Sequence, residues 1–120
     1  GTTYPGGYEN LIIADTTPPR VFFGKYSSFG EYWTWQNGSG LSTIVSTKYY
    51  PGRHSAVAGT NGRVVFAEPT NATSGEVWTW KEGEQVSQLL TGLKNPGRHS
   101  MRVSSDNTFY WTALDQYLDV

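Results

Sequence analysis

Arginine and histidine stand next to each other twice in this chain, within the pentapeptide Pro-Gly-Arg-His-Ser that occupies residues 51–55 and again residues 96–100. A guanidinium group can hold a carboxylate or a sugar hydroxyl, and an imidazole can exchange a proton or bind a metal. Pro and Gly favour turns, so both pentapeptides are expected at the ends of strands. The ligand-binding residues predicted on this basis are Arg53, His54, Arg98 and His99.

A structural explanation of the same residues stays open. A duplicated unit repeats its residues by descent, so the Arg and His side chains could simply hydrogen-bond to neighbouring backbone. The beginning of the chain also departs from the pattern, because Gly7-Tyr8-Glu9 stands where Arg-His-Ser would be expected. Even an assembled protein would therefore not present a uniform ring of histidines.

The pentapeptide belongs to a longer repeat. Gly-Glu-Tyr-Trp-Thr-Trp at residues 30–35 returns as Gly-Glu-Val-Trp-Thr-Trp at residues 75–80, and both repeated motifs are offset by the same 45 residues. An offset shared by two separate motifs indicates that a whole structural unit has been duplicated. A period near 45 is typical of the blades of a β-propeller.

Four strands are predicted in each unit, because short runs of β-branched and aromatic residues alternate with turns rich in Gly, Pro and Asn. The runs cover residues 10–14, 20–26, 31–35 and 41–47, then 54–58, 63–68, 76–80 and 85–91, then 99–103 and 108–113. No helical period is found. The predicted fold is therefore all-β, a single domain over residues 1–120 with antiparallel four-stranded units at 10–50 and 54–95 and a partial unit at 99–120.

The order of motifs within a unit resembles the blades of the NHL and SMP-30/gluconolactonase group of propellers. The residues that carry this resemblance are 11–15, 61–68, 75–92 and 96–112. The resemblance implies a ring of four-stranded sheets whose first strands line a channel, with residues 51–55 and 96–100 on the face where ligands bind. The acidic metal-binding set of the gluconolactonase group cannot be placed in this sequence, so that activity is not implied.

Two and a half blades cannot close a ring, since known propellers have about four to eight blades. Isolated ends would also leave strand edges unpaired, which proteins avoid. The expected partners are therefore further copies of the chain in a homo-oligomer, or the remainder of a larger propeller.

Other residues could bind a sugar. The tryptophans Trp35 and Trp80 are predicted ligand-binding residues that could stack on a sugar ring, although a strand in the middle of a sandwiched sheet favours packing between sheets instead. Arg20 with Glu31, and likewise residues 63 and 76, resemble loosely the Arg and Glu that hold sugar hydroxyls in fucose-binding propeller lectins, which assemble from short chains. A cross-strand ion pair explains the same residues.

Composition narrows the class of function. The net charge of −1 gives no basic surface for nucleic acid, no apolar run is long enough to span a membrane, and the chain has no cysteine for a disulfide or a zinc site. No motif for a cofactor or metal is found. We expect a non-enzymatic, lectin-like module that binds a glycan or another ligand, with an extracellular or cell-surface location favoured. The alternatives are a propeller lyase or hydrolase with His at the channel mouth, and a structural or protein-interaction scaffold.

Overall fold

Antiparallel β-sheet forms the whole of the regular structure in the computed structural model, which describes residues 9–26, 30–48, 50–53, 55–69, 75–93 and 100–112. The first sheet has the order β1-β2-β3-β4, with bounds Glu9–Ala14, Arg20–Tyr26, Gly30–Gln36 and Gly40–Lys48. The second has the order β5-β6-β7-β8, with bounds Ala56–Ala58, Val64–Pro69, Gly75–Trp80 and Ser87–Leu93. A hairpin follows, made of β9 (Arg102–Val103) and β10 (Phe109–Tyr110).

The all-β prediction is confirmed, and the strands lie close to the predicted runs. Strand β10 ends earlier than predicted, at Tyr110, and β5 and β9 start later than predicted, at Ala56 and Arg102. Residues 54 and 99, where these strands were expected to start, lie outside the described residues. The described part of the chain holds no helix, and so none that could cross a membrane.

Turn chemistry explains where the strands end. Between β3 and β4 the amide of Ser39 donates to the carbonyl of Gln36 at 3.0 Å, and the same bond recurs from Glu84 to Lys81 between β7 and β8. Both turns contain a glycine with positive φ, Gly38 at 90° in the first and Gly83 at 89° in the second. Glycine adopts this backbone conformation without the steric cost that a Cβ atom brings.

The hairpin β9–β10 repeats the beginning of the second sheet. In the turn before β6, the Gly59 amide donates to the Arg63 carbonyl at 2.9 Å, and in the hairpin the Ser104 amide donates to the Thr108 carbonyl, also at 2.9 Å. The two turns are also linked, because the Asn107 Oδ1 atom accepts a hydrogen bond from the Thr60 amide at 2.8 Å. The first sheet, the second sheet and this hairpin are here named the first, second and third units.

The first and second sheets pack face to face, and the two faces that meet are not equivalent sides of the repeated unit. One side of the first sheet, here named the Tyr32 face, carries Arg20, Phe22, Tyr32 and Thr34, all of them buried. It packs against the side of the second sheet that carries Phe66, Trp78 and Trp80. The Tyr32 and Phe66 rings stack at 4.7 Å between centroids, and the edge of Phe22 meets Trp80 at 6.1 Å. Aromatic pairs with these geometries stabilise a core beyond the area that they bury.

The second sheet packs on the hairpin in the same sense. Its other side carries Val65, Ala67 and Val77, which form a second buried cluster with Met101 of the third unit. The hairpin residues Phe109 and Trp111 pack against this cluster. The second sheet thus turns one face to the first sheet and the opposite face to the hairpin.

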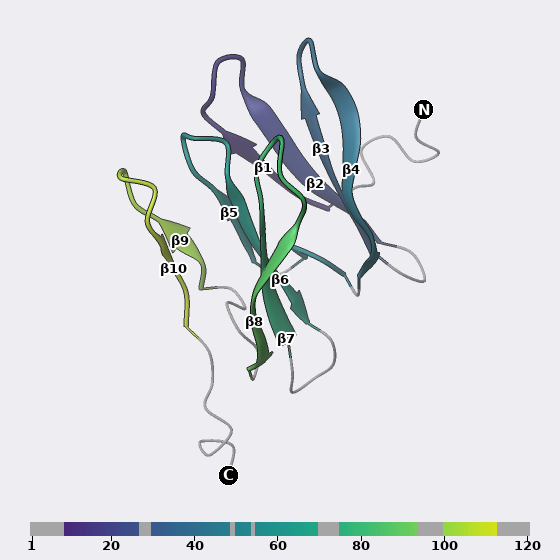
Figure 1. The fold of residues 1–120 in the computed structure, drawn as a ribbon, viewed down its shortest axis with the longest axis vertical. Coiled ribbons are helices and arrows are strands. Elements are labelled where there is room, and N and C mark those ends of the chain that lie inside the picture. The colour runs from purple at the N-terminus through teal and green to yellow at the C-terminus, as the bar shows by residue number, and fades with distance from the viewer. Residues whose placement is uncertain are drawn as a thin grey trace.

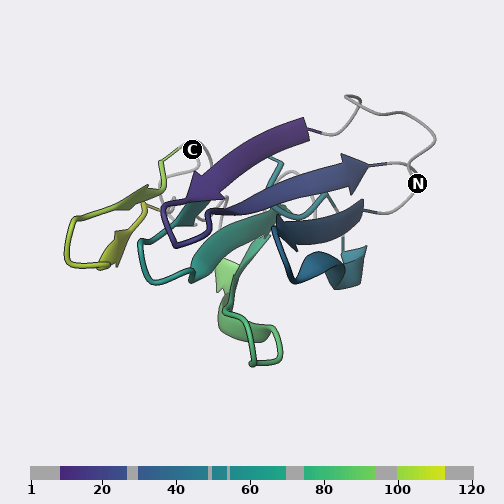
Figure 2. The same ribbon diagram turned by 90° about the horizontal axis from the view of Figure 1, so that it is seen from above.

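The three units follow one another across the molecule, from the purple and blue first sheet through the teal and green second sheet to the yellow hairpin (Figure 1). Strand β1 contacts β5, and β5 contacts β9, so the first strands of consecutive units are neighbours. The view from above shows the same succession (Figure 2).

Candidate ligand-binding site

The first Pro-Gly-Arg sequence forms a tight turn between β4 and β5. The Arg53 amide donates to the Tyr50 carbonyl at 3.2 Å, and the Gly52 amide donates to the carbonyl of Ala67 in β6 at 2.8 Å. The Asn10 side chain donates to the Gly52 carbonyl from the side of β1. Bonds to two strands hold this turn in one position.

Glycine is required in the turn for two reasons. Gly52 has a φ of +73°, which favours glycine, and a Cβ atom at this position would lie 2.6 Å from Cε1 of Tyr32. Gly30, at the start of β3, is equally close to the turn, since its Cβ would lie 2.3 Å from Cδ of Pro51. The two repeated motifs therefore touch each other in the first unit.

Arg53 is exposed at the tip of this turn, whereas Pro51 and Gly52 are buried. Its guanidinium carbon lies 4.9 Å from the centroid of the Tyr50 ring, a cation–π distance. Stacking on the ring orients the planar guanidinium group, and its N–H donors then suit the two oxygens of a carboxylate. The turn can therefore present a cationic, partly aromatic surface to a ligand.

The other predicted residues of the two pentapeptides, His54, Arg98 and His99, lie outside the described residues. The second pentapeptide is represented only by Ser100, whose hydroxyl accepts a hydrogen bond from the Thr112 amide at 3.2 Å. Among the residues that the structure does describe, no group of three His, Cys, Asp or Glu side chains could hold a metal ion.

The predicted tryptophans are not close to this turn. Trp35 is at the opposite end of β3 from Gly30, and five residues of extended strand span about 16 Å. Trp35 is 42% exposed, so no second sheet of the described chain covers it. Trp80 is half-buried between the two sheets, where Phe22 and Arg20 contact its ring, and we assign it to packing.

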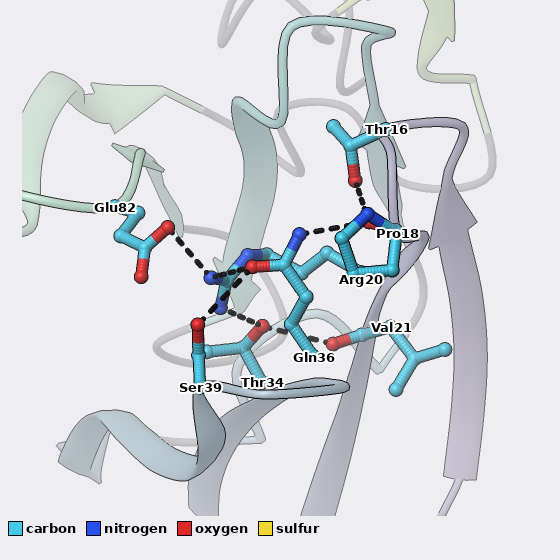
Figure 3. Close-up of polar contacts among 8 residues, drawn as sticks. All are labelled: Thr16, Pro18, Arg20, Val21, Thr34, Gln36, Ser39 and Glu82. Carbon is cyan, nitrogen blue, oxygen red and sulfur yellow. Dashed lines mark hydrogen bonds and ion pairs between the residues drawn. The ribbon is translucent and has the colours of Figure 1, made fainter.

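Arg20 forms a buried polar cluster that joins the sheets (Figure 3). Only 4% of Arg20 is exposed, and its guanidinium group donates to the Thr34 hydroxyl at 3.1 Å and to Oε1 of Gln36 at 2.8 Å. The same group forms an ion pair of 2.9 Å with Glu82 of the second sheet and lies 5.5 Å from the Trp80 centroid. Because all of these partners are protein groups, we assign Arg20 to stability.

The predicted pairing of Arg20 with Glu31 is wrong, and so is that of Arg63 with Glu76. Arg20 stands opposite Gln36 at one end of the sheet, whereas Glu31 stands opposite Lys25 near the other end and forms an ion pair with it at 3.7 Å. Arg63 repeats the Arg20 arrangement, with the Thr79 hydroxyl at 3.1 Å and Glu84 at 2.8 Å.

Sequence reasoning missed Glu82 and Glu84 as the partners of these arginines. Both residues lie in or just after the β7–β8 turn. Glu82 belongs to the second sheet and pairs with Arg20 of the first sheet. Residue spacing within one unit cannot reveal a contact between two units.

Comparisons with known proteins add no relative, since no family model, no curated protein and no solved structure matches this chain.

Proposed function

We propose that this chain is a non-enzymatic binding module of the β-propeller type, which binds a ligand that carries a carboxylate group. The propeller assignment is supported by two sheets of the same strand order. It is also supported by their packing, because the second sheet contacts the first sheet with one face and the hairpin with the other. It is also supported by the adjacent first strands β1, β5 and β9, because the innermost strands of propeller blades surround a common axis.

The observation that carries the ligand proposal is the exposure of Arg53 on a fixed turn. If the repeated pentapeptide served only to join strands, its cation could be buried among other protein groups, as Arg20 is buried among side chains. Arg53 is exposed, and its guanidinium group lies over the Tyr50 ring, with 4.9 Å between its carbon and the ring centroid. A rigid donor group loses little conformational entropy when it binds.

Carbohydrates with carboxylate groups fit this surface best. The guanidinium group would pair with the carboxylate, and the Tyr50 ring offers an apolar face to a sugar ring. Arginine stays protonated at any physiological pH and cannot act as an acid or base, so the described part of the turn supports binding rather than catalysis.

A glycan array that includes acidic and neutral glycans tests this proposal. We expect the wild-type protein to bind acidic glycans. The variant Arg53→Ala should lose about tenfold or more in affinity, because a hydrogen bond to a charged group contributes about 1.5–3 kcal/mol. Arg53→Lys should lose less, since it keeps the charge but not the fork of donors.

Lys81→Ala is the matched control, because it removes a cation at the opposite end of the strands, next to the β7–β8 turn. Binding of acidic glycans that is unchanged in Arg53→Ala, or no binding by the wild type, would contradict the proposal. In the competing enzyme interpretation His54 or His99 acts as a base or as a metal ligand. Metal analysis of the same samples tests the metal-ligand form, which stoichiometric metal that is lost in His99→Ala would support.

A further inference from the structure

Large apolar side chains are exposed at both ends of the stack of units. Among the described residues they are Leu11, Ile13, Trp35, Leu41, Leu89 and Tyr110. Four of the six lie on the first sheet and one on the hairpin, which are the first and last units of the chain. Exposed apolar patches of this kind commonly mark an interaction site.

The exposed residues of the first sheet form one continuous surface, here named the Trp35 face. Ile13 pairs with Val21, Val21 with Trp35, and Trp35 with Leu41, so a row of apolar side chains crosses all four strands. The next row contains Phe23 opposite Trp33. This is the side of the first sheet opposite to the buried Tyr32 face.

The second sheet shows what covers such a face. Its corresponding row contains Ala58, Val64 and Trp80, since Ala58 pairs with Val64 and Val64 with Trp80. The Tyr32 face of the first sheet covers this row, and the Phe22 and Trp80 rings form a T-shaped pair with 6.1 Å between their centroids. The natural occupant of the Trp35 face is therefore the opposite face of another unit of the same kind.

The hairpin offers such a face at the other end of the stack. Val103 lies 45 residues after Ala58 and pairs with Phe109, as Ala58 pairs with Val64 and Ile13 with Val21. The next residue, Tyr110, therefore takes the position that Phe22 has in the first unit.

Tyr110 is 58% exposed. The exposed residues on its side of the hairpin, here named the Tyr110 face, are Arg102, Tyr110 and Thr112.

We infer that copies of this chain associate head to tail, with the Tyr110 face of one copy against the Trp35 face of the next. Tyr110 would meet Trp35 across the interface as Phe22 meets Trp80 within the chain. A contact between two different surfaces does not end with a pair, so it generates a closed ring or an open chain of copies. This inference is independent of the ligand proposal, because none of its residues belongs to the turn at 50–53.

Sedimentation velocity over a range of protein concentrations tests the interface. We expect the wild-type mass to rise with concentration, and the variants Trp35→Glu and Tyr110→Glu each to weaken self-association by about tenfold or more, because each places a charge in an apolar contact. Leu89→Glu is the matched control, since Leu89 is equally exposed but lies on neither face. It should associate as the wild type does.

A mixture of the two variants distinguishes head-to-tail association from the pairing of two identical faces. Each variant keeps one intact face, so Trp35→Glu with Tyr110→Glu should form a one-to-one dimer that grows no further. A wild-type protein that remains monomeric at all concentrations would overturn the inference. So would self-association of Tyr110→Glu at wild-type strength, which would indicate that two Trp35 faces pair with each other.

Discussion

Arg20 links the first sheet to the second, and its removal tests how much that link stabilises the fold. Arg20→Ala removes hydrogen bonds to Thr34 and Gln36 together with the contact to Glu82. We expect the free energy of unfolding to fall by about 2 kcal/mol or more, as is usual for buried hydrogen bonds to a charged group.

Arg63→Ala is the matched control for this substitution. Arg63 likewise donates to a threonine hydroxyl and forms an ion pair, but its partner Glu84 belongs to the same sheet, and the two side chains are 28% and 45% exposed. A loss of about 1 kcal/mol or less is expected for such a surface pair. Urea unfolding of both variants measures the difference, and equal losses would show that Arg20 makes no special contribution to the packing between sheets.

Gly52 is the residue at which the turn and the core meet. In Gly52→Ala the new methyl group would lie 2.6 Å from the Tyr32 ring, at a φ of +73° that already disfavours alanine. We expect a loss of about 2–4 kcal/mol, from about 1 kcal/mol for the backbone and about 1–3 kcal/mol for overpacking.

Gly83→Ala separates these two contributions, because Gly83 has a similar φ of +89° and no atom within 4 Å of its Cβ position. It should lose only the backbone part, about 1 kcal/mol. Thermal or urea unfolding compares the two variants. If both lose the same amount, the close approach of the turn to Tyr32 does not restrict this position.

The sequence shows which residue types recur, but not where each one lies in the molecule. Trp35 and Trp80 occupy the same position in the same repeated strand, yet Trp80 lies between two sheets and Trp35 is exposed. The difference comes from the neighbouring units, since a preceding unit covers Trp80. The turn at 50–53 was predictable because Pro-Gly acts locally, and its Arg53 is exposed as the binding hypothesis requires.

At the scale of elements, one carboxylate accepts hydrogen bonds within the turn of the β9–β10 hairpin. Asp106 accepts hydrogen bonds from the Ser104 hydroxyl and from the Thr108 amide. The bonds from Ser104, and then those from Thr108, lower the pKa of Asp106 below its ordinary value. A carboxylate with a lowered folded-state pKa stabilises the folded turn fully above its unfolded pKa of about 3.9, and this contribution is lost as the pH falls through the lowered value.

NMR titration of the Asp106 carboxylate measures this effect directly. We expect a pKa below that of an unstructured aspartate, and faster amide hydrogen exchange at Thr108 in acid after correction for the intrinsic rate. In Asp106→Asn the exchange should lose this acid dependence. An Asp106 that titrates at or above the ordinary value would contradict the assignment.

Strands were predictable from local patterns, whereas their starting points depend on contacts between them. Alternation of aromatic residues and glycine-containing turns located all ten strands to within a few residues. Strand β5 starts later than predicted because the turn reaches almost to its first residue. The Gly52 amide of the turn donates to the Ala67 carbonyl, whereas the Ala67 amide donates to the Ser55 carbonyl in the same register as the β5–β6 pairs.

At the scale of the whole molecule, duplication predicted equivalent sheets but not which faces meet. Alternation places Tyr32 and Trp33 on opposite sides of a strand, but both sides of these strands are rich in aromatic residues, so hydrophobicity alone does not choose between them. In the structure the Tyr32 face of the first sheet packs on the second sheet, and the corresponding face of the second sheet packs on the hairpin. That regular packing is the reason why the two exposed ends are complementary rather than alike.

Chemical cross-linking of two single-cysteine variants tests this complementarity most directly. The chain has no cysteine of its own, so Leu41→Cys and Arg102→Cys each carry one defined thiol. Leu41 pairs with Trp35 and Arg102 with Tyr110, so each thiol lies on one of the two faces while Trp35 and Tyr110 stay in place. The two proteins, one with a mass tag, are mixed and treated with a short bis-maleimide, with Leu89→Cys as the control. Head-to-tail stacking predicts a product that joins Leu41→Cys to Arg102→Cys in preference to either homodimer. A product that joins two Leu41→Cys chains, or cross-linking no stronger than that of Leu89→Cys, would contradict it.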